Sequence, residues 1–112
     1  MGAGGENSAA AFLAERNFAI LAKNFRWGKY GEIDIIARRG NMILFVEVKN
    51  RASDRFGGAL HSISKKKKNS IKLTARSFIA KNPEYNDPGL TFRFDLISIS
   101  DGKTEWIEDM FR

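Results

Sequence analysis

GEIDIIARRGNMILFVEVK, residues Gly31 to Lys49, is the stretch of sequence that decides the fold. Its two ends, Gly31–Arg38 and Met42–Lys49, are rich in β-branched and aromatic residues, which favour strands. The Gly40-Asn41 pair between them has the residue types of a tight two-residue turn. The stretch therefore predicts two antiparallel strands joined in a hairpin.

The turn also sets which residues of the two strands face each other. A two-residue loop pairs Arg39 with Met42 and, counting back, places Asp34 opposite Glu47. A loop shifted back by one residue makes Glu47 a diagonal neighbour of Asp34 on the same face, whereas a three-residue loop breaks the arrangement. The first two alternatives both predict two carboxylates on one face of the hairpin.

Two basic residues follow Glu47 on the same face of its strand. Residues two apart on a strand share a face, so Lys49 and Arg51 lie on the face of Glu47. Val46 and Val48 point into the opposite layer. Facing carboxylates repel each other and need a compensating cation. Mg²⁺ or Mn²⁺ prefers such oxygen ligands together with phosphate and water, and an adjacent ammonium can orient the water. Asp34 and Glu47 are therefore predicted metal ligands of a phosphodiester-hydrolysing site, with Lys49 beside them.

The alternative interpretation is a cross-strand salt-bridge network on a solvated sheet face. Apolar residues surround the charged ones on both strands, however: Ile33, Ile35 and Ile36 near Asp34, and Phe45, Val46 and Val48 near Glu47. These neighbours indicate central, buried strands. Buried charges need a partner or a function, which favours the metal site.

A third acid is predicted to join the site from a helix. Glu6 precedes Ala9 and Leu13 by three and seven residues, which places it on their apolar face. Glu6 is therefore a candidate metal ligand with Asp34 and Glu47. The alternative is that an acid in a first turn only stabilises the helix dipole.

The flanking segments show the periodicities of helices and strands. They predict a helix over Gly5–Arg16, a strand over Phe18–Trp27, a loop over Asn50–Ala59, a helix over Ser62–Lys81, a strand over Thr91–Ser100 and a short last strand near Trp106. This order predicts an α/β fold with a mixed sheet flanked by helices. With no internal repeat or linker, residues 1–112 are expected to form a single domain.

Composition narrows the class of protein. The 112 residues carry a net charge of +6 and a pI near 9.8, which favours polyanionic partners such as nucleic acid. The chain contains no cysteine, which excludes disulfides, thiolate metal sites and a cysteine nucleophile. No signal peptide and no apolar run long enough to span a membrane are recognised, so we expect a cytoplasmic location and no membrane association.

The second helix carries most of the basic residues. Seven lysines and arginines and no acid lie between His61 and Asn82, a pattern typical of a phosphate-backbone contact, although a solvated basic face remains the alternative. Lys67 lies four residues from both Ile63 and Ile71, so it is expected to face inward toward the site. The residues predicted to contact nucleic acid are Arg26, Arg51, Lys65, Lys66, Lys67, Lys68 and Lys72.

Several short motifs in this order resemble the YraN-like family of bacterial proteins. They are Gly5-Glu6, Asn24-Phe25-Arg26, Gly31-Glu32-Ile33-Asp34, Phe45-Val46-Glu47-Val48-Lys49 with Arg51, Phe56-Gly57, Lys67 and Arg93-Phe94-Asp95. The resemblance spans nearly the whole chain. Members of this uncharacterised family are regarded as predicted endonucleases of the restriction-endonuclease-like PD-(D/E)XK superfamily, similar to archaeal Holliday-junction resolvases.

This resemblance implies an αβββαβ core and a Mg²⁺- or Mn²⁺-dependent endonuclease acting on DNA, including structured or branched DNA. It implies a catalytic set of Asp34, Glu47 and Lys49, joined by Glu6. By analogy with resolvases, symmetric cleavage of junctions would require a homodimer, for which the sequence shows no clear surface. Two alternatives remain: a non-catalytic nucleic-acid-binding module with an unused nuclease site, and an interaction protein whose charged cluster is structural.

Overall fold

The computed structural model describes residues 2–50 and 63–112, with side chains from residue 6 onward in the first segment. The elements are α1 (Gly2–Ala14), β1 (Ala19–Trp27), β2 (Gly31–Arg39), β3 (Met42–Asn50), α2 (Lys65–Lys81), the 3-10 helix η2 (Pro83–Tyr85), β4 (Thr91–Ser100) and β5 (Lys103–Phe111). The predicted loop over Asn50–Ala59 lies, after its first residue, outside the described residues, and so do Arg51 and His61.

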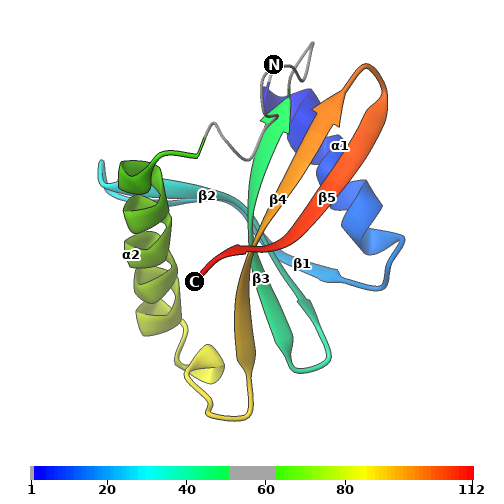
Figure 1. Ribbon diagram of the computed structural model, residues 1–112. Coiled ribbons are helices and arrows are strands. Elements are labelled where there is room, and N and C mark those ends of the chain that lie inside the picture. The colour runs from blue at the N-terminus through cyan, green and yellow to red at the C-terminus, as the bar shows by residue number, and fades with distance from the viewer. Residues whose placement is uncertain (1, 51–62) are drawn as a thin grey trace.

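The five strands form a mixed sheet in the order β1-β2-β3-β4-β5 (Figure 1). Neighbouring strands are antiparallel except β3 and β4, which run parallel. A parallel pair needs a crossover connection, and α2 lies in the crossover between β3 and β4. The predicted mixed sheet flanked by helices and the αβββαβ core are confirmed, and the fold is compatible with that of restriction endonucleases.

Each face of the sheet has its own apolar core beneath one helix. The core under α1 consists of Ala9, Leu13, Phe18, Ile35, Ala37, Leu44, Val46 and Ile97. The core under α2 consists of Ile33, Ile36, Ile43, Phe45, Ile71, Ala75 and Phe78. Strands β2 and β3 contribute to both cores, as expected for central strands that are buried on two sides.

The predicted boundaries of the first helix were wrong by two or three residues. The helix begins at Gly2, ahead of the predicted Gly5, because glycines are weak helix formers and hid the first turn. It closes after Ala14 with Asn17 in the left-handed conformation, φ 71°. The Asn17 and Phe18 N–H groups donate to the carbonyls of Ala14 and Leu13, a Schellman-type ending.

Two further predictions need correction. The second helix begins at Lys65, not Ser62, because the Ser64 hydroxyl accepts the Lys67 N–H at 3.0 Å and caps the helix. The last strand is not short: β5 runs over nine residues and pairs with β4 along most of its length. The sequence of β5 lacks a clear alternation of apolar and polar residues, because many of its side chains are charged and exposed. An edge strand tolerates such residues, since it is covered on fewer sides than a central strand.

Among the described helices, none combines the length and the apolar character needed to cross a membrane.

Candidate active site

The site lies where β2 and β3 separate. The predicted pairing of Arg39 with Met42 is confirmed, so the turn is Gly40-Asn41. The ladder continues to the pair Ile35–Val46 and ends there, one position before Asp34 and Glu47. In Figure 1, β1 and β2 bend toward α2 while β3 continues beside β4. Asp34 therefore lies at a fork between two strands; the prediction of a direct cross-strand pair was wrong although its register was right.

The carboxylate of Asp34 occupies the fork. Its Oδ2 atom accepts a hydrogen bond from the backbone N–H of Val48 at 2.8 Å, in a place where a regular ladder would supply a carbonyl. Burial, followed by the charge of Glu47, raises the pKa of Asp34 from 3.8 to about 7, against the lowering effect of the Val48 hydrogen bond. Asp34 is thus a carboxyl group poised near neutral pH.

Glu47 is the most buried carboxylate at the fork, with 5% of its surface exposed. Its Oε2 atom lies 3.7 Å from Lys49 Nζ and 3.6 Å from Lys67 Nζ. Its Oε1 atom is buried and has no hydrogen-bond partner among residues 2–50 and 63–112. A buried acceptor left without a partner costs free energy, so this oxygen is an available ligand position. The predicted inward direction of Lys67 is confirmed by its ion pair with Glu47.

Glu6 approaches the same place from α1. It lies beyond the first turn of the helix, so a helix-dipole role in that turn does not explain it. It is partly buried, on the helix that packs Ala9 and Leu13 onto the sheet. Its charge contributes to the raised pKa of Asp34. The charges of Glu6 on α1 and Glu47 on β3 therefore both act on Asp34 in β2.

The donor atoms fit a hard divalent cation that takes part of its coordination from outside the protein. No group of three or more acids and histidines within residues 2–50 and 63–112 has the spacing of a ready-made metal cage. Mg²⁺ needs no such cage, since one or two carboxylates, substrate phosphate and water commonly complete its shell. Asp34, with its raised pKa, and the Oε1 atom of Glu47 would supply the two carboxylates for such an ion.

The other predicted nucleic-acid contacts do not form one patch. On α2, Lys65 and Lys66 are exposed, whereas Lys68 and Lys72 lie over the ring of Phe111 on β5. Arg26 on β1 lies 3.5 Å from Glu32 on β2, and its side chain is 70% exposed. The structure therefore separates Lys67, which contacts the site, from lysines that line other surfaces.

Ser98 is a further candidate site residue, which the sequence interpretation did not name. It pairs with Lys49 across the parallel β3–β4 ladder. Its hydroxyl is buried and has no hydrogen-bond partner in the described part of the chain. Ser98 also lines a hollow of about 430 Å³ formed by the β4–β5 hairpin. The alternation of side chains along a strand could have identified Ser98 from the sequence. Ser98 follows buried Leu96 by two residues, so it shares that face of the strand, where a small polar residue is unexpected.

The Arg93-Phe94-Asp95 motif has a different role. Asp95 is fully buried, and its two oxygens accept bonds from Arg93 Nε and Nη2, both at 2.9 Å. The indole N–H of Trp106 and the backbone N–H of Asp109 also donate to it, at 2.8 and 2.9 Å. Its bond with Asp95 raises the pKa of Arg93. This satisfied network joins β4 to the irregular part of β5 and is structural.

Comparisons with known proteins match nearly the whole chain. The model of the uncharacterised protein family UPF0102 matches residues 5–99. A UPF0102 protein of Sulfurihydrogenibium sp. is 42% identical over 95% of this chain and 89% of its own length. Others from Nitrosomonas europaea and Thermodesulfovibrio yellowstonii are 40% and 42% identical, over 98% and 99% of this chain and 92% and 95% of their own lengths. None of these names states an activity.

Proposed function

Because this chain belongs to the uncharacterised protein family UPF0102, whose name states no activity, we propose its function from the geometry of the fork: a metal-dependent endonuclease that hydrolyses phosphodiester bonds in DNA. The expected resemblance to the YraN-like family, which is this family, is confirmed. The nuclease activity is an inference from the residues at the site.

One observation supports the proposal above the others. Asp34 and Glu47 are held in a buried fork at the cost of a strongly raised pKa at Asp34 and an unpartnered Oε1 at Glu47. A purely structural network would satisfy these groups, as the Asp95 network does. A buried, unsatisfied carboxylate oxygen beside an acid with a strongly raised pKa is typical of a functional site.

Each residue has a defined role in the proposed reaction. Asp34 and Glu47 would hold Mg²⁺ or Mn²⁺, with Glu6 assisting from α1. When bound, the ion would polarise the scissile phosphate and acidify a water molecule. Lys49, beside Glu47, orients the attacking water and offsets negative charge that develops on the phosphate. Lys67, which forms an ion pair with Glu47 from α2, draws the phosphate toward the site.

A non-catalytic nucleic-acid-binding module is the alternative, and it is supported by the basic charge of α2. The two functions differ in what neutralising Asp34 does. In a nuclease, Asp34→Asn abolishes cleavage and leaves or strengthens DNA binding, because a repulsive negative charge is lost. In a binding module, wild-type protein leaves every DNA intact while its affinity still falls steeply with salt.

The test is cleavage of labelled single-stranded, duplex, flap and four-way-junction DNA with Mg²⁺ or Mn²⁺. We expect wild type to cleave at least one substrate and Asp34→Asn and Glu47→Gln to lose at least about 100-fold in rate. Glu15→Gln is the control, since Glu15 is an exposed acid of the same chain segment as Glu6, with 76% of its side chain accessible. Cleavage that survives in both site variants, or no cleavage by wild type, would refute the nuclease.

A further inference from the structure

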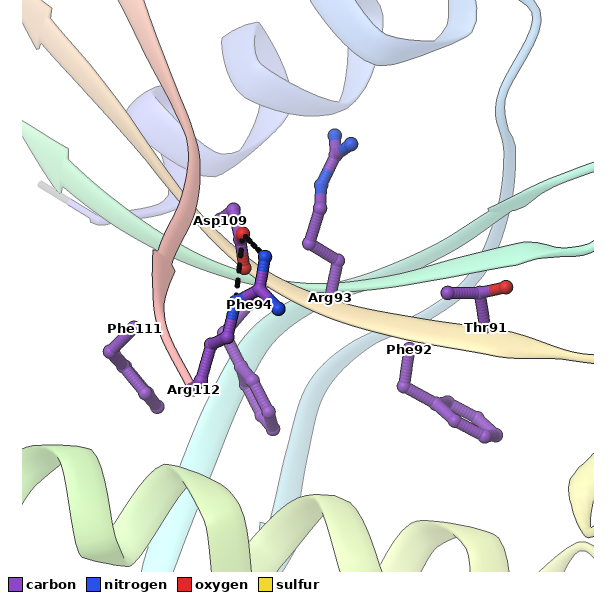
Figure 2. A pocket seen from close by; sticks show the side chains of 7 residues that line it. All are labelled: Thr91, Phe92, Arg93, Phe94, Asp109, Phe111 and Arg112. Atoms are coloured by element: carbon purple, nitrogen blue, oxygen red, sulfur yellow. Dashed lines mark hydrogen bonds and ion pairs between the residues drawn. The ribbon is translucent and has the colours of Figure 1, made fainter.

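An aromatic groove lies between α2, the first residues of β4 and the end of β5. It consists of two adjoining hollows of about 260 and 310 Å³. They share Phe92, Phe94 and Arg112, and Figure 2 shows these residues together with Phe111 above the ribbon of α2. The groove belongs to the face of the sheet that α2 covers, which is also the face of Lys67 and Glu47.

The floor of the aromatic groove is a row of phenyl rings. Phe111 stacks on Phe94, with centroids 5.0 Å apart and planes at 15°. Phe94 stacks on Phe45 at 5.5 Å and 28°, and Phe45 on Phe92 at 6.0 Å and 21°. Phe92, Phe94 and Phe111 are half-buried, so part of each ring remains accessible. Exposed parts of aromatic rings can stack with bases of any sequence.

A stripe of cations borders the rings. Lys68, Lys72 and Arg76 recur every four residues on α2, so they follow one side of the helix. Lys72 and Arg76 line the groove, and the Nζ atoms of Lys68 and Lys72 lie 6.0 and 5.4 Å from the centroid of Phe111. No ion pair links these three cations to an acid in the described part of the chain. Lys72 Nζ donates to the backbone carbonyl of Arg112. No acid of the described residues neutralises the three positive charges, so they can still attract an anionic partner.

The aromatic groove connects to the fork along β3 and α2. Phe45 precedes Glu47 by two residues on β3, so both side chains lie on the same face of the sheet. On α2, Lys67 contacts Glu47 and the next residue, Lys68, begins the cationic stripe. A strand bound in the groove would thus lead directly to the acids of the fork.

We propose that the aromatic groove binds an unpaired nucleic-acid strand, with bases against the phenyl rings and phosphates against Lys68, Lys72 and Arg76. This inference rests on the proposed function and narrows its substrate to DNA that carries a single-stranded segment, such as a flap. A row of partly exposed rings bordered by cations matches the two features of a single strand, exposed base faces and a charged backbone. A duplex offers no free base faces to the rings.

The test measures binding of a short labelled oligo(dT) and of a blunt duplex by fluorescence anisotropy in EDTA, so that no cleavage occurs. Phe111→Leu keeps the apolar bulk but removes the ring, and Phe111→Trp keeps a ring. We expect Phe111→Leu to lose about 5- to 100-fold in oligo(dT) affinity, with less than about twofold change for the duplex, and Phe111→Trp to retain affinity. Lys72→Gln should weaken oligo(dT) binding and reduce the dependence of its affinity on salt concentration. The reduction in slope should correspond to the loss of about one phosphate contact.

Phe25→Leu is the matched control. Phe25 also has a lysine over its ring, Lys81 at 5.7 Å, and it contacts another phenylalanine, Phe78, edge to face at 5.2 Å, but it lies on β1, away from the aromatic groove. Its loss should leave oligo(dT) affinity unchanged. Equal weakening by Phe25→Leu and Phe111→Leu would overturn the proposal, because both would then act through general stability.

Two further outcomes separate this inference from the nuclease proposal. If wild type cleaves DNA but Phe111→Leu binds oligo(dT) normally, the groove inference fails alone. If wild type cleaves no DNA but oligo(dT) binding depends on Phe111, the groove inference is supported and the nuclease proposal is refuted. Should Phe111→Leu instead convert a dimer to a monomer in sedimentation without affecting oligo(dT) binding, the groove is a contact between two copies of the chain and the proposal is wrong.

Discussion

The side chain of Asp34 accepts the backbone N–H of Val48 at 2.8 Å, and in doing so it ends the ladder between β2 and β3. A carboxylate thus takes the place of a backbone carbonyl at the point where the strands part. The bond anchors Asp34 on the residue between Glu47 and Lys49. A single contact therefore couples the shape of the sheet to the spacing of the acids.

Asp34 should make the metal-free protein lose stability as pH rises. Its pKa of about 7 in the folded protein exceeds the ordinary value of 3.8, so the folded state binds more protons between these two pH values. The free energy of unfolding therefore falls from about pH 4 to pH 7 and levels above that. Asp34→Asn, which can still accept the Val48 N–H, should be more stable than wild type at about pH 8 and gain nothing near pH 4.

Urea unfolding in EDTA across this pH range measures the effect, with Glu15→Gln as an exposed control. Added Mg²⁺ should raise the stability of wild type at about pH 8 but not that of Asp34→Asn, because a ligand stabilises the state that binds it. The raised pKa of Asp34 would be contradicted if the free energy of unfolding of wild type rose between pH 4 and pH 7 by more than that of Asp34→Asn.

Lys67 and Lys66 should behave differently although they are neighbours in one lysine run. Lys67 lies 3.6 Å from Glu47, whereas Lys66 is exposed. Lys67→Gln should slow cleavage about 10- to 100-fold, since it removes a charge that stabilises the reacting phosphate. Lys66→Gln should leave the rate constant of saturated enzyme unchanged and reduce only the salt dependence of binding. Single-turnover kinetics distinguish the two; identical profiles would mean that the whole run is a solvated face.

Ser98→Ala should affect activity more than stability. The Ser98 hydroxyl has no partner to lose, so the free energy of unfolding should change by less than about 1 kcal/mol. If the hydroxyl orients water or phosphate beside Lys49, the cleavage rate should fall about tenfold. Ser100→Ala, in the same hollow, is the control. Unchanged cleavage in Ser98→Ala would remove this residue from the site.

The Asp95 network should be a major source of stability. Asp95→Ala leaves the Arg93 guanidinium without its buried partner and should cost about 3 to 5 kcal/mol. Glu108 also contacts Arg93, at 3.3 Å, but its side chain is 53% exposed, so Glu108→Ala should cost less than about 1 kcal/mol. Urea denaturation compares them. Similar losses in the two variants would show that burial does not distinguish these ion pairs.

Gly31 should be required for the approach of α2 to β2. A Cβ atom at this position would overlap the side-chain oxygens of Thr74 and Ser70, and the Ser70 hydroxyl donates to the Tyr30 carbonyl at 2.7 Å. Gly31→Ala should therefore destabilise the fold by about 1 to 3 kcal/mol. Gly89→Ala, which meets only Asp87 at 3.3 Å, is the comparison. Thermal unfolding of both variants tests this; a neutral Gly31→Ala would mean that the helix shifts freely.

The hairpin was predictable because its information is local. Residues 31–49 contain the β-branched strands and the Gly40-Asn41 turn, and a two-residue turn leaves one register, which the structure confirms from Arg39 to Ile35. Lys67 was predictable for the same reason, since its position relative to Ile71 depends only on helical period. The aromatic groove was not predictable, because Phe45, Phe94 and Phe111 belong to three different strands. The order of these strands in the sheet cannot be inferred from the sequence of any one of them.

By itself, then, the sequence determined the elements, the pairing within the hairpin, the burial of its strands and the identity of the charged residues, all of which follow from short-range periodicity and turn chemistry. Only the tertiary structure decided that the ladder stops before Asp34, that Glu47 has an unpartnered oxygen, and that Ser98 lies beside Lys49. These depend on how the sheet bends and how β4 docks after the α2 crossover. Bending and docking are set by packing between residues far apart in the chain, which no local pattern records.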